Sequence, residues 1–200
     1  MISIFSADSG QQLKEFLPSE CHIHFAKSYG RENPDHRYLI RSDIIKNFGE
    51  TWSTEQKQSF LDLKKLPVVP NGFVSISHTD SGGIWIFSSQ NVGVDLEQTG
   101  NISDKTVARM SSSEEIDHSK NFFPSLAPLW TAKESAFKAL SPSNEITVLS
   151  QININWLKKI PISQSETILL SQVQTLKKNS CNGLSIINEE FCFSVMILRS

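Results

Sequence analysis

Three short apolar segments lie close together near the middle of the chain, and their spacing limits the possible folds more than any other feature. Residues 73–77, 84–88 and 92–96 alternate in polarity and are rich in β-branched side chains, as strands are. The connections contain Asp80-Ser81-Gly82-Gly83 and Gln90-Asn91, which are turn residues. The pattern therefore predicts three strands in an antiparallel meander.

Helical patterns precede and follow these strands. Asn33 and Pro34 begin a helix that Gly49 ends, and Ser53 with Gln56 resembles a capping box. Ser125 is expected to cap the longest helix, which ends at residue 140. Further helices are expected over 11–17 with a continuation towards 27, over 53–63, from 103 and from 113, and further strands over 2–5, 152–156, 166–173, 184–187 and 191–198. This order of elements predicts an α+β fold.

The composition excludes several classes of protein. The 200 residues suit one domain or two small halves, and 38% hydrophobic with 20% charged residues is typical of globular chains. A formal charge of −2 argues against a nucleic-acid-binding protein. No apolar run is long enough to span a membrane, and the N-terminus lacks a signal-peptide pattern. We expect a cytoplasmic protein whose cysteines, Cys21, Cys181 and Cys192, are free thiols.

Acidic residues on one strand and one helix suggest a metal site. Asp95 and Glu97 are two apart on a strand and share a face, while Glu134 and Lys138 are four apart on a helix and share a face. If that helix crosses that strand, three carboxylates and a lysine converge, and a hard divalent cation would relieve their repulsion. This indicates metal-assisted chemistry on a phosphate. The alternative is that Asp95 and Glu97 are solvated surface acids.

Each of the other polar candidates also has both a functional and a structural interpretation. Glu134 interrupts an apolar stripe, where a lone carboxylate is costly, although it could also form an ordinary surface pair with Lys138. Ser77 and His78 end a strand and could bind phosphate oxygens, or could be structural. Arg37 could grip a phosphate with its guanidinium group, or could be a solvated helix charge.

Taken in order, these segments resemble the 4′-phosphopantetheinyl transferase superfamily, specifically the longer monomeric type that activates peptide and polyketide synthases. The resemblance extends from about residue 31 to residue 140. The chain departs from the family pattern at Lys64-Lys65-Leu66-Pro67, where a Gly-Lys-Pro element is usual. The matching segments are Arg31-Glu32-Asn33 with His36-Arg37, Phe73-Val74-Ser75-Ile76-Ser77-His78-Thr79, Gly93-Val94-Asp95-Leu96-Glu97, and the helix with Trp130, Lys133, Glu134 and Lys138.

The resemblance implies a monomer of two pseudo-symmetric α+β halves, residues 1–90 and 91–200. Each half would be an antiparallel sheet packed with helices, and coenzyme A would lie between the halves. The implied reaction transfers 4′-phosphopantetheine from coenzyme A to a serine of an apo acyl or peptidyl carrier protein and releases 3′,5′-adenosine bisphosphate. Nucleic acid and membrane are not expected partners.

The resemblance also implies roles for individual residues. The Mg²⁺ ligands would be Asp95, Glu97 and Glu134, with Glu134 also the candidate base. The phosphates would be neutralised by Lys138 and Lys133, and contacted by Ser77, His78 and Arg37. Two other interpretations stay open: a degenerate family member that binds coenzyme A or carrier protein without turnover, and a non-enzymatic interaction module.

Overall fold

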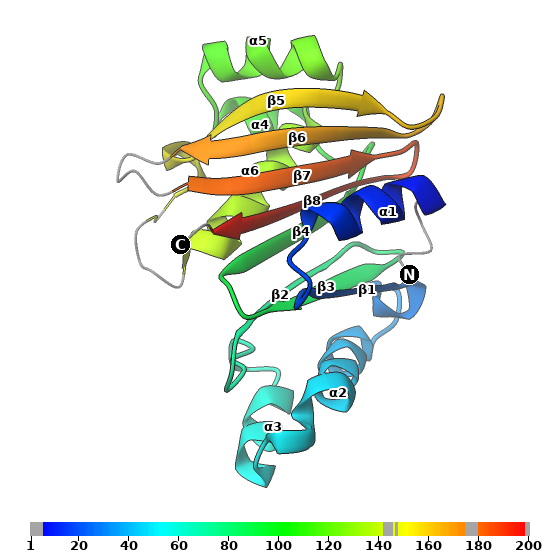
Figure 1. The fold of residues 1–200 in the computed structure, drawn as a ribbon, viewed down its shortest axis with the longest axis vertical. Helices are drawn as coiled ribbons and strands as arrows, with labels where there is room; N and C mark the ends of the chain where they lie inside the picture. The colour runs from blue at the N-terminus through cyan, green and yellow to red at the C-terminus, as the bar shows by residue number, and fades with distance from the viewer. Residues whose placement is uncertain (1–5, 142–145, 147, 175–179, 199–200) are drawn as a thin grey trace.

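The fold contains two antiparallel sheets and six α-helices in the part of the chain that is described (Figure 1). The computed structural model describes residues 6–141, 146, 148–174 and 180–198. The helices are α1 Ala7–Phe16, α2 His36–Phe48, α3 Thr54–Leu61, α4 Asp104–Ala108, α5 Ser113–Phe122 and α6 Ala127–Leu140. The strands are β1 His22–Ala26, β2 Phe73–His78, β3 Gly83–Ser88, β4 Val92–Gln98, β5 Asn153–Pro161, β6 Thr167–Gln174, β7 Ser180–Ile187 and β8 Phe191–Leu198.

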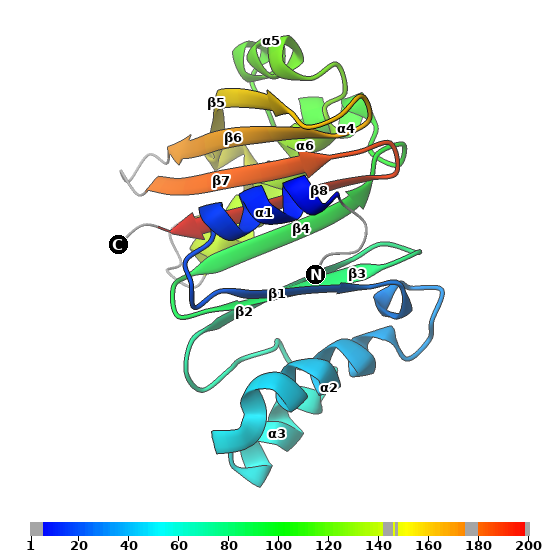
Figure 2. The same cartoon turned by 45° about the vertical axis from the view of Figure 1, so that its right-hand side comes forward.

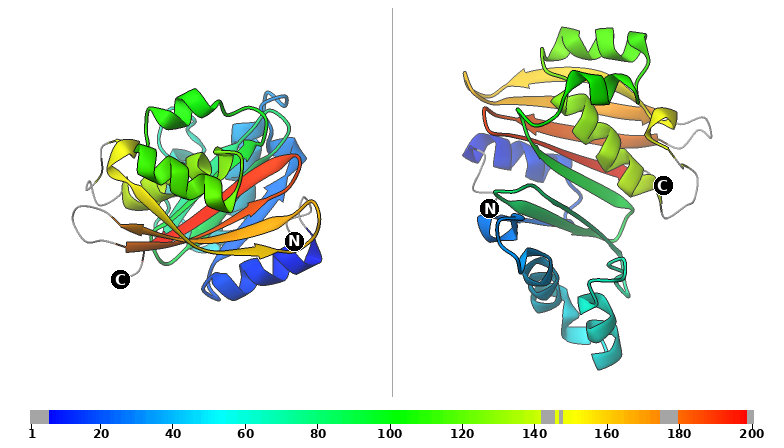
Figure 3. Two further views of the ribbon diagram at one scale, coloured as in Figure 1. Left: turned by 90° about the horizontal axis from the view of Figure 1, so that it is seen from above. Right: turned by 180° about the vertical axis from the view of Figure 1, so that it is seen from behind.

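The two sheets lie one above the other along the long axis of the molecule. The smaller sheet has the order β1-β3-β2 and packs against α2, and the larger has the order β4-β8-β7-β6-β5. Helices α4, α5 and α6 lie on one side of the larger sheet, and α1 crosses its other face (Figures 2 and 3). The predicted α+β class is confirmed. The predicted division into halves 1–90 and 91–200 stays a prediction, and α1 packs on the sheet of the other half.

Three sequence-based expectations about the elements differ from the structure. The meander does not include its third strand, because β4 pairs with β8 in the larger sheet rather than with β3. The expected helical continuation towards residue 27 is instead β1, which pairs with β3 and buries Phe25. The capping box of Ser53 and Gln56 is confirmed. The N-cap position of α6 is Leu126 and not Ser125, but the Ser125 hydroxyl accepts the amide of Ala127 (3.2 Å) at the start of that helix. The strand expected over 2–5 lies outside the described residues.

Side-chain hydroxyls of β2 join the two sheets. Strand β4 is an edge strand, so half of its amide groups find no partner in its own sheet. Val94 and Leu96 donate these amides to the Oγ atoms of Ser75 (3.0 Å) and Ser77 (3.2 Å). These two hydrogen bonds hold the end of β2 beside the middle of β4.

Helix α6 lies close to β4, and this approach is possible because residue 93 is glycine. A Cβ atom placed on Gly93 would lie 1.8 Å from the carbonyl oxygen of Ser135 and 2.7 Å from the amide nitrogen of Ala139. Both contacts are with backbone atoms, which cannot rotate away. Glycine at this position therefore permits the approach of α6 to β4, and side-chain alternation turns Asp95 and Glu97 to the same face.

A buried ion pair joins α6 to the outer part of the larger sheet. Lys133 is 0% exposed, and its Nζ lies 2.8 Å from Oε2 of Glu115 on α5. Lys133 also donates to the carbonyl of Ile152, while Oε1 of Glu115 accepts the amide of Ile154 (2.7 Å). Burial lowers the pKa of Lys133, and the hydrogen bond and charge of Glu115 oppose that shift. The pair connects α5, α6 and β5 within the core.

In the described part of the chain, the helices are too short or too polar to traverse a lipid bilayer.

The contact at Gly93 predicts a steric cost for any side chain there. We expect Gly93→Ala to lower the free energy of unfolding by about 1–3 kcal/mol or more, because backbone must move to admit the methyl group. Urea unfolding measures this cost. The matched control is Gly10→Ala in α1, where an added Cβ meets nothing within 4 Å; this change should stabilise the protein by about 0.5–1 kcal/mol. Equal effects at both sites would contradict the prediction.

The ion pair of Lys133 and Glu115 predicts a larger loss. We expect Lys133→Met to lower the free energy of unfolding by about 3–5 kcal/mol, because Glu115 is left buried without its cation. The double variant Lys133→Met/Glu115→Gln should recover most of this loss, since glutamine keeps an acceptor for Ile154. Lys120→Met, at an exposed position of α5, serves as the control and should change the free energy of unfolding by less than about 0.5 kcal/mol. A single variant as stable as the control would contradict the assignment.

Candidate metal and phosphate site

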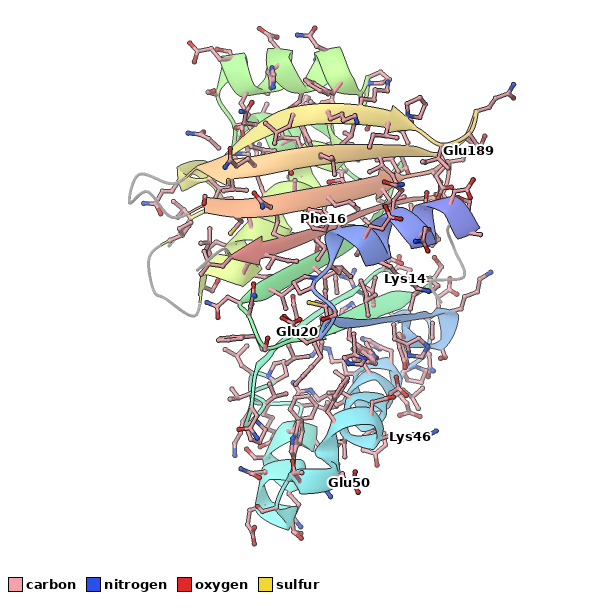
Figure 4. All side chains as sticks on the ribbon, in the orientation of Figure 1. Lys14, Phe16, Glu20, Lys46, Glu50 and Glu189 are labelled. Atoms are coloured by element: carbon pink, nitrogen blue, oxygen red, sulfur yellow. The ribbon has the colours of Figure 1, made fainter. Side chains whose placement is uncertain are left out.

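Asp95 stands out because it is a buried acid, whereas charged side chains such as Lys46, Glu50 and Glu189 point away from the fold (Figure 4). Asp95 is 4% exposed. Its Oδ1 accepts from Lys138 Nζ (2.8 Å) and from Ser77 Oγ (2.9 Å). Its Oδ2 is buried and has no hydrogen-bond partner among the residues that the structure describes. Burying an unsatisfied carboxylate oxygen is costly, so Oδ2 marks a position where a further ligand would be favourable.

Two glutamates lie in the electrostatic field of Asp95. Burial, and then the charge of Asp95, raise the pKa of Glu97 to about 7, while Lys138 and a hydrogen bond from the Trp130 side chain oppose the shift. Burial, and then Asp95, also raise the pKa of Glu134, again opposed by Lys138. The carboxyl groups of Glu97 and Glu134 are thus harder to ionise beside Asp95. Repulsion of this kind is what the sequence-based hypothesis of a metal site expects. An added cation would favour the charged form of both glutamates.

Lys138 supplies the positive charge beside these acids. Its Nζ donates to Asp95 and to the carbonyl of Val94 (3.0 Å), so the lysine ties the last turn of α6 to β4. A single ammonium group offsets only part of the charge of Asp95, Glu97 and Glu134. The cluster therefore keeps a net negative charge when all three acids are ionised.

The residues present fit a magnesium ion. Across the described residues, no group of three or more His, Cys, Asp or Glu side chains forms a ready-made metal centre. Mg²⁺, however, commonly uses one or two carboxylates and takes its other ligands from water and substrate phosphates. The orphaned Oδ2 of Asp95, with Glu97 and Glu134 nearby, matches that oxygen donor chemistry.

A cavity of about 670 Å³ adjoins this cluster. Phe137 and Lys138 of α6 form one wall, and Arg37 of α2 and His78 of β2 contribute to the others. The segment after α3 adds Leu63, Lys64, Lys65, Leu66 and Pro67 to the lining. Basic side chains surround much of the cavity although the chain carries a net charge of −2, so its chemistry suits a phosphorylated ligand.

His78 is held as a neutral hydrogen-bond donor. Its Nδ1 accepts from Arg31 Nε (3.2 Å), which assigns the proton to Nε2. Burial, followed by the charge of His36, lowers the pKa of His78 to about 4. The ring also packs edge-to-face on His36, with 4.7 Å between centroids. His78 therefore keeps one N–H group available at the cavity near neutral pH.

The structure brings some predicted residues together and leaves others apart. Asp95, Glu97, Glu134 and Lys138 share one cluster, and Arg37 and His78 lie at the adjoining cavity. Lys133 lies in the core with Glu115, so in this structure it does not reach the cavity. Ser77 is 8% exposed, and its hydroxyl is already bonded to Asp95 and Leu96.

Sequence reasoning missed several contributors to this site. Trp130 hydrogen bonds to Glu97, and Arg31 fixes the tautomer of His78. Trp130 lies four residues before Glu134 and so shares its helix face, a spacing that could have indicated the first contact. The contact of Arg31 with His78 joins residues 47 apart, and no local pattern predicts it.

Comparison with known proteins agrees with this geometry. The family model of the 4′-phosphopantetheinyl transferase superfamily matches residues 91–186. The match begins at β4 and includes all of α6, so Asp95, Glu97, Glu134 and Lys138 lie within it. A comparison with curated proteins gave no significant match. Residues 91–186 therefore form a domain of the 4′-phosphopantetheinyl transferase superfamily.

Proposed function

We propose that the protein transfers the 4′-phosphopantetheine group of coenzyme A to a serine hydroxyl of an apo acyl or peptidyl carrier protein, in a Mg²⁺-dependent reaction. One observation carries this proposal: a buried Asp95 with an orphaned oxygen lies beside Lys138 at a basic cavity, inside a domain of this superfamily. Carboxylates that need a cation and a cavity that suits phosphates are the two requirements for chemistry on a pyrophosphate.

The proposed roles follow from the contacts. The ligands of Mg²⁺ would be Asp95, Glu97 and Glu134, and the ion would offset charge that develops on the pyrophosphate. Ser77 holds Asp95 in place through its hydroxyl, a positioning role rather than a direct phosphate contact. Lys133 is left out of the chemistry because it is committed to Glu115.

The remaining groups would act on the phosphates and on the acceptor. Arg37, Lys138 and the N–H of His78 would neutralise or bind phosphate oxygens. The serine oxygen of the carrier protein would form a bond to the β-phosphorus as the bond from that phosphorus to the bridging oxygen breaks. The serine proton would pass to Glu134, whose carboxylate burial and the charge of Asp95 make more basic than that of an exposed glutamate. The bridging oxygen would leave with 3′,5′-adenosine bisphosphate.

We also propose the longer monomeric type, with halves 1–90 and 91–200, acting in the cytoplasm on carrier proteins of secondary metabolite synthases. The resemblance over residues 31–140 supports this assignment, since it includes Arg31 and His36-Arg37 ahead of the matched domain.

The metal and base assignments predict the behaviour of two conservative variants. Asp95→Asn and Glu134→Gln should each lower the rate of transfer by about 10²-fold or more, because each removes a charge at the reacting phosphates while keeping the side-chain shape. The measurement is the gain of mass of an apo carrier protein incubated with coenzyme A and Mg²⁺. Glu114→Gln, at an exposed position of α5, is the matched control and should react at the wild-type rate.

Three outcomes separate this proposal from its rivals. Full activity in both variants would contradict the metal assignment. Binding of coenzyme A without transfer to any of several carriers would favour a degenerate family member. Failure to bind coenzyme A in the presence of Mg²⁺ would favour a non-enzymatic interaction module.

The pKa of Glu97 predicts how the metal-free protein responds to pH. Because folding raises this pKa from 4.5 to about 7, the folded state binds the proton more tightly than the unfolded chain does. The associated stability is fully present below pH 4.5 and is lost as pH rises through 7. In EDTA, Glu97→Gln should therefore gain stability over wild type by roughly 1–2 kcal/mol between pH 4.5 and pH 8, after allowance for partial solvent exposure.

Urea unfolding across that pH range measures the difference. Added Mg²⁺ should stabilise wild type more at pH 8 than at pH 5.5, and should stabilise Glu97→Gln less than wild type. Glu114→Gln is again the control and should differ from wild type by the same amount at each pH. A difference between Glu97→Gln and wild type that does not change with pH would contradict the pKa assignment.

A further inference from the structure

A buried arginine of α2 lies at the cavity but has no role in the chemistry proposed above. Arg41 is 7% exposed. Its Nη1 donates to the carbonyl oxygens of Phe60 (2.7 Å) and Asp62 (2.8 Å), and its Nη2 donates to that of Lys65 (2.7 Å). The guanidinium carbon also lies 5.7 Å from the centre of the Phe60 ring. One side chain thus binds three backbone carbonyls over six residues.

The contacts of Arg41 require a guanidinium group. Its planar fork can reach several separate carbonyls at once, whereas the ammonium of lysine is a single point donor. Burial lowers the pKa of Arg41, and the charge of Arg37 adds to this effect while that of Asp62 opposes it. Carbonyl partners offset the cost of burying the charge only while the loop backbone keeps its present path. The side chain and the loop therefore fix each other.

The segment that Arg41 holds is one wall of the cavity. After α3 the chain turns tightly, with the amide of Lys65 bonded to the carbonyl of Asp62 (3.0 Å) and that of Lys64 bonded to the Asp62 side chain (3.1 Å). Residues 63–67 then line the cavity together with Phe137 and Lys138 of α6. The shape of the cavity on this side thus depends on where Arg41 places the turn.

We propose that Arg41 is a positioning residue that fixes the wall formed by residues 62–67 and thereby sets the affinity of the cavity for coenzyme A. This inference rests on the proposed function, because that function places coenzyme A in the cavity. Arg41 itself need not touch the ligand. Its effect is to keep Lys64 and Lys65 at the cavity before the ligand arrives, so that little ordering is left to occur on binding.

Calorimetric binding of coenzyme A with Mg²⁺ tests the proposal on wild type, Arg41→Met, Arg41→Lys and the control Arg109→Met. Arg109 is an exposed arginine at the end of α4 and does not line the cavity. We expect Arg41→Met to raise the dissociation constant by at least about tenfold. The KM for coenzyme A should rise by a similar factor while kcat changes by less than about threefold. Arg41→Lys should be intermediate, and Arg109→Met should match wild type.

Hydrogen exchange supplies a readout that does not depend on activity. Amides of residues 62–66 should exchange faster in Arg41→Met than in wild type, while amides of β4 and β8 keep their protection. If Arg41→Met does not fold, Arg41→Lys decides the question by the same two measurements. Lower thermal stability with unchanged affinity and unchanged exchange over 62–66 would show an ordinary structural role and overturn the proposal.

The test also separates this inference from the proposed function. Wild type that binds coenzyme A but transfers nothing to any carrier protein would contradict the proposed transfer, while the affinities and exchange rates would still decide the role of Arg41. Wild type that binds no coenzyme A would overturn both.

Discussion

The unpaired edge of β4 is the constraint on which the rest of the structure depends. Because β4 has no neighbouring strand on this side, the amides of Val94 and Leu96 would lack partners in the interior of the molecule. The hydroxyls of Ser75 and Ser77 bind them, so β2 is attached to β4 by side chains instead of by a strand ladder. The Ser77 hydroxyl also donates a hydrogen bond to Asp95. The same contact joins the sheets and orients the central acid of the site.

The site combines a rigid frame with unfavourable electrostatics. Gly93 lets α6 approach β4, and Lys138 and Ser77 hold one oxygen of Asp95, while the other finds no partner in the described part of the chain. Glu97 and Glu134 resist ionisation in the same field. Natural proteins tolerate such local costs mainly where function requires them, and the surrounding core carries the stability that offsets them.

The sequence allowed much of the fold and the centre of the site to be predicted, since both depend on short-range patterns. Strand alternation placed Asp95 and Glu97 on one face, and helical spacing placed Glu134 with Lys138. Pairing of β4 with β8 joins segments about a hundred residues apart, and short turns suggested a nearer partner instead. The core position of Lys133 depends on Glu115 and Ile152, which lie on elements that no local pattern brings together. Which residue of a helix face points to a cavity and which to the core is decided by packing.

The core position of Lys133 changes how a motif of this kind should be interpreted. Lys133, Glu134 and Lys138 are neighbours in one short segment, yet they serve different ends: two lie at the cluster with Asp95, and one joins α5 to β5. Under the proposed function, a screen that measures only turnover would not distinguish the loss of the fold at Lys133 from the loss of chemistry at Glu134 or Lys138. A chain that had lost its transfer activity could still retain lysine at position 133, because its fold would still need the ion pair with Glu115. Among these neighbours, the residues at 134 and 138 are therefore the informative ones for telling an active relative from a retired one.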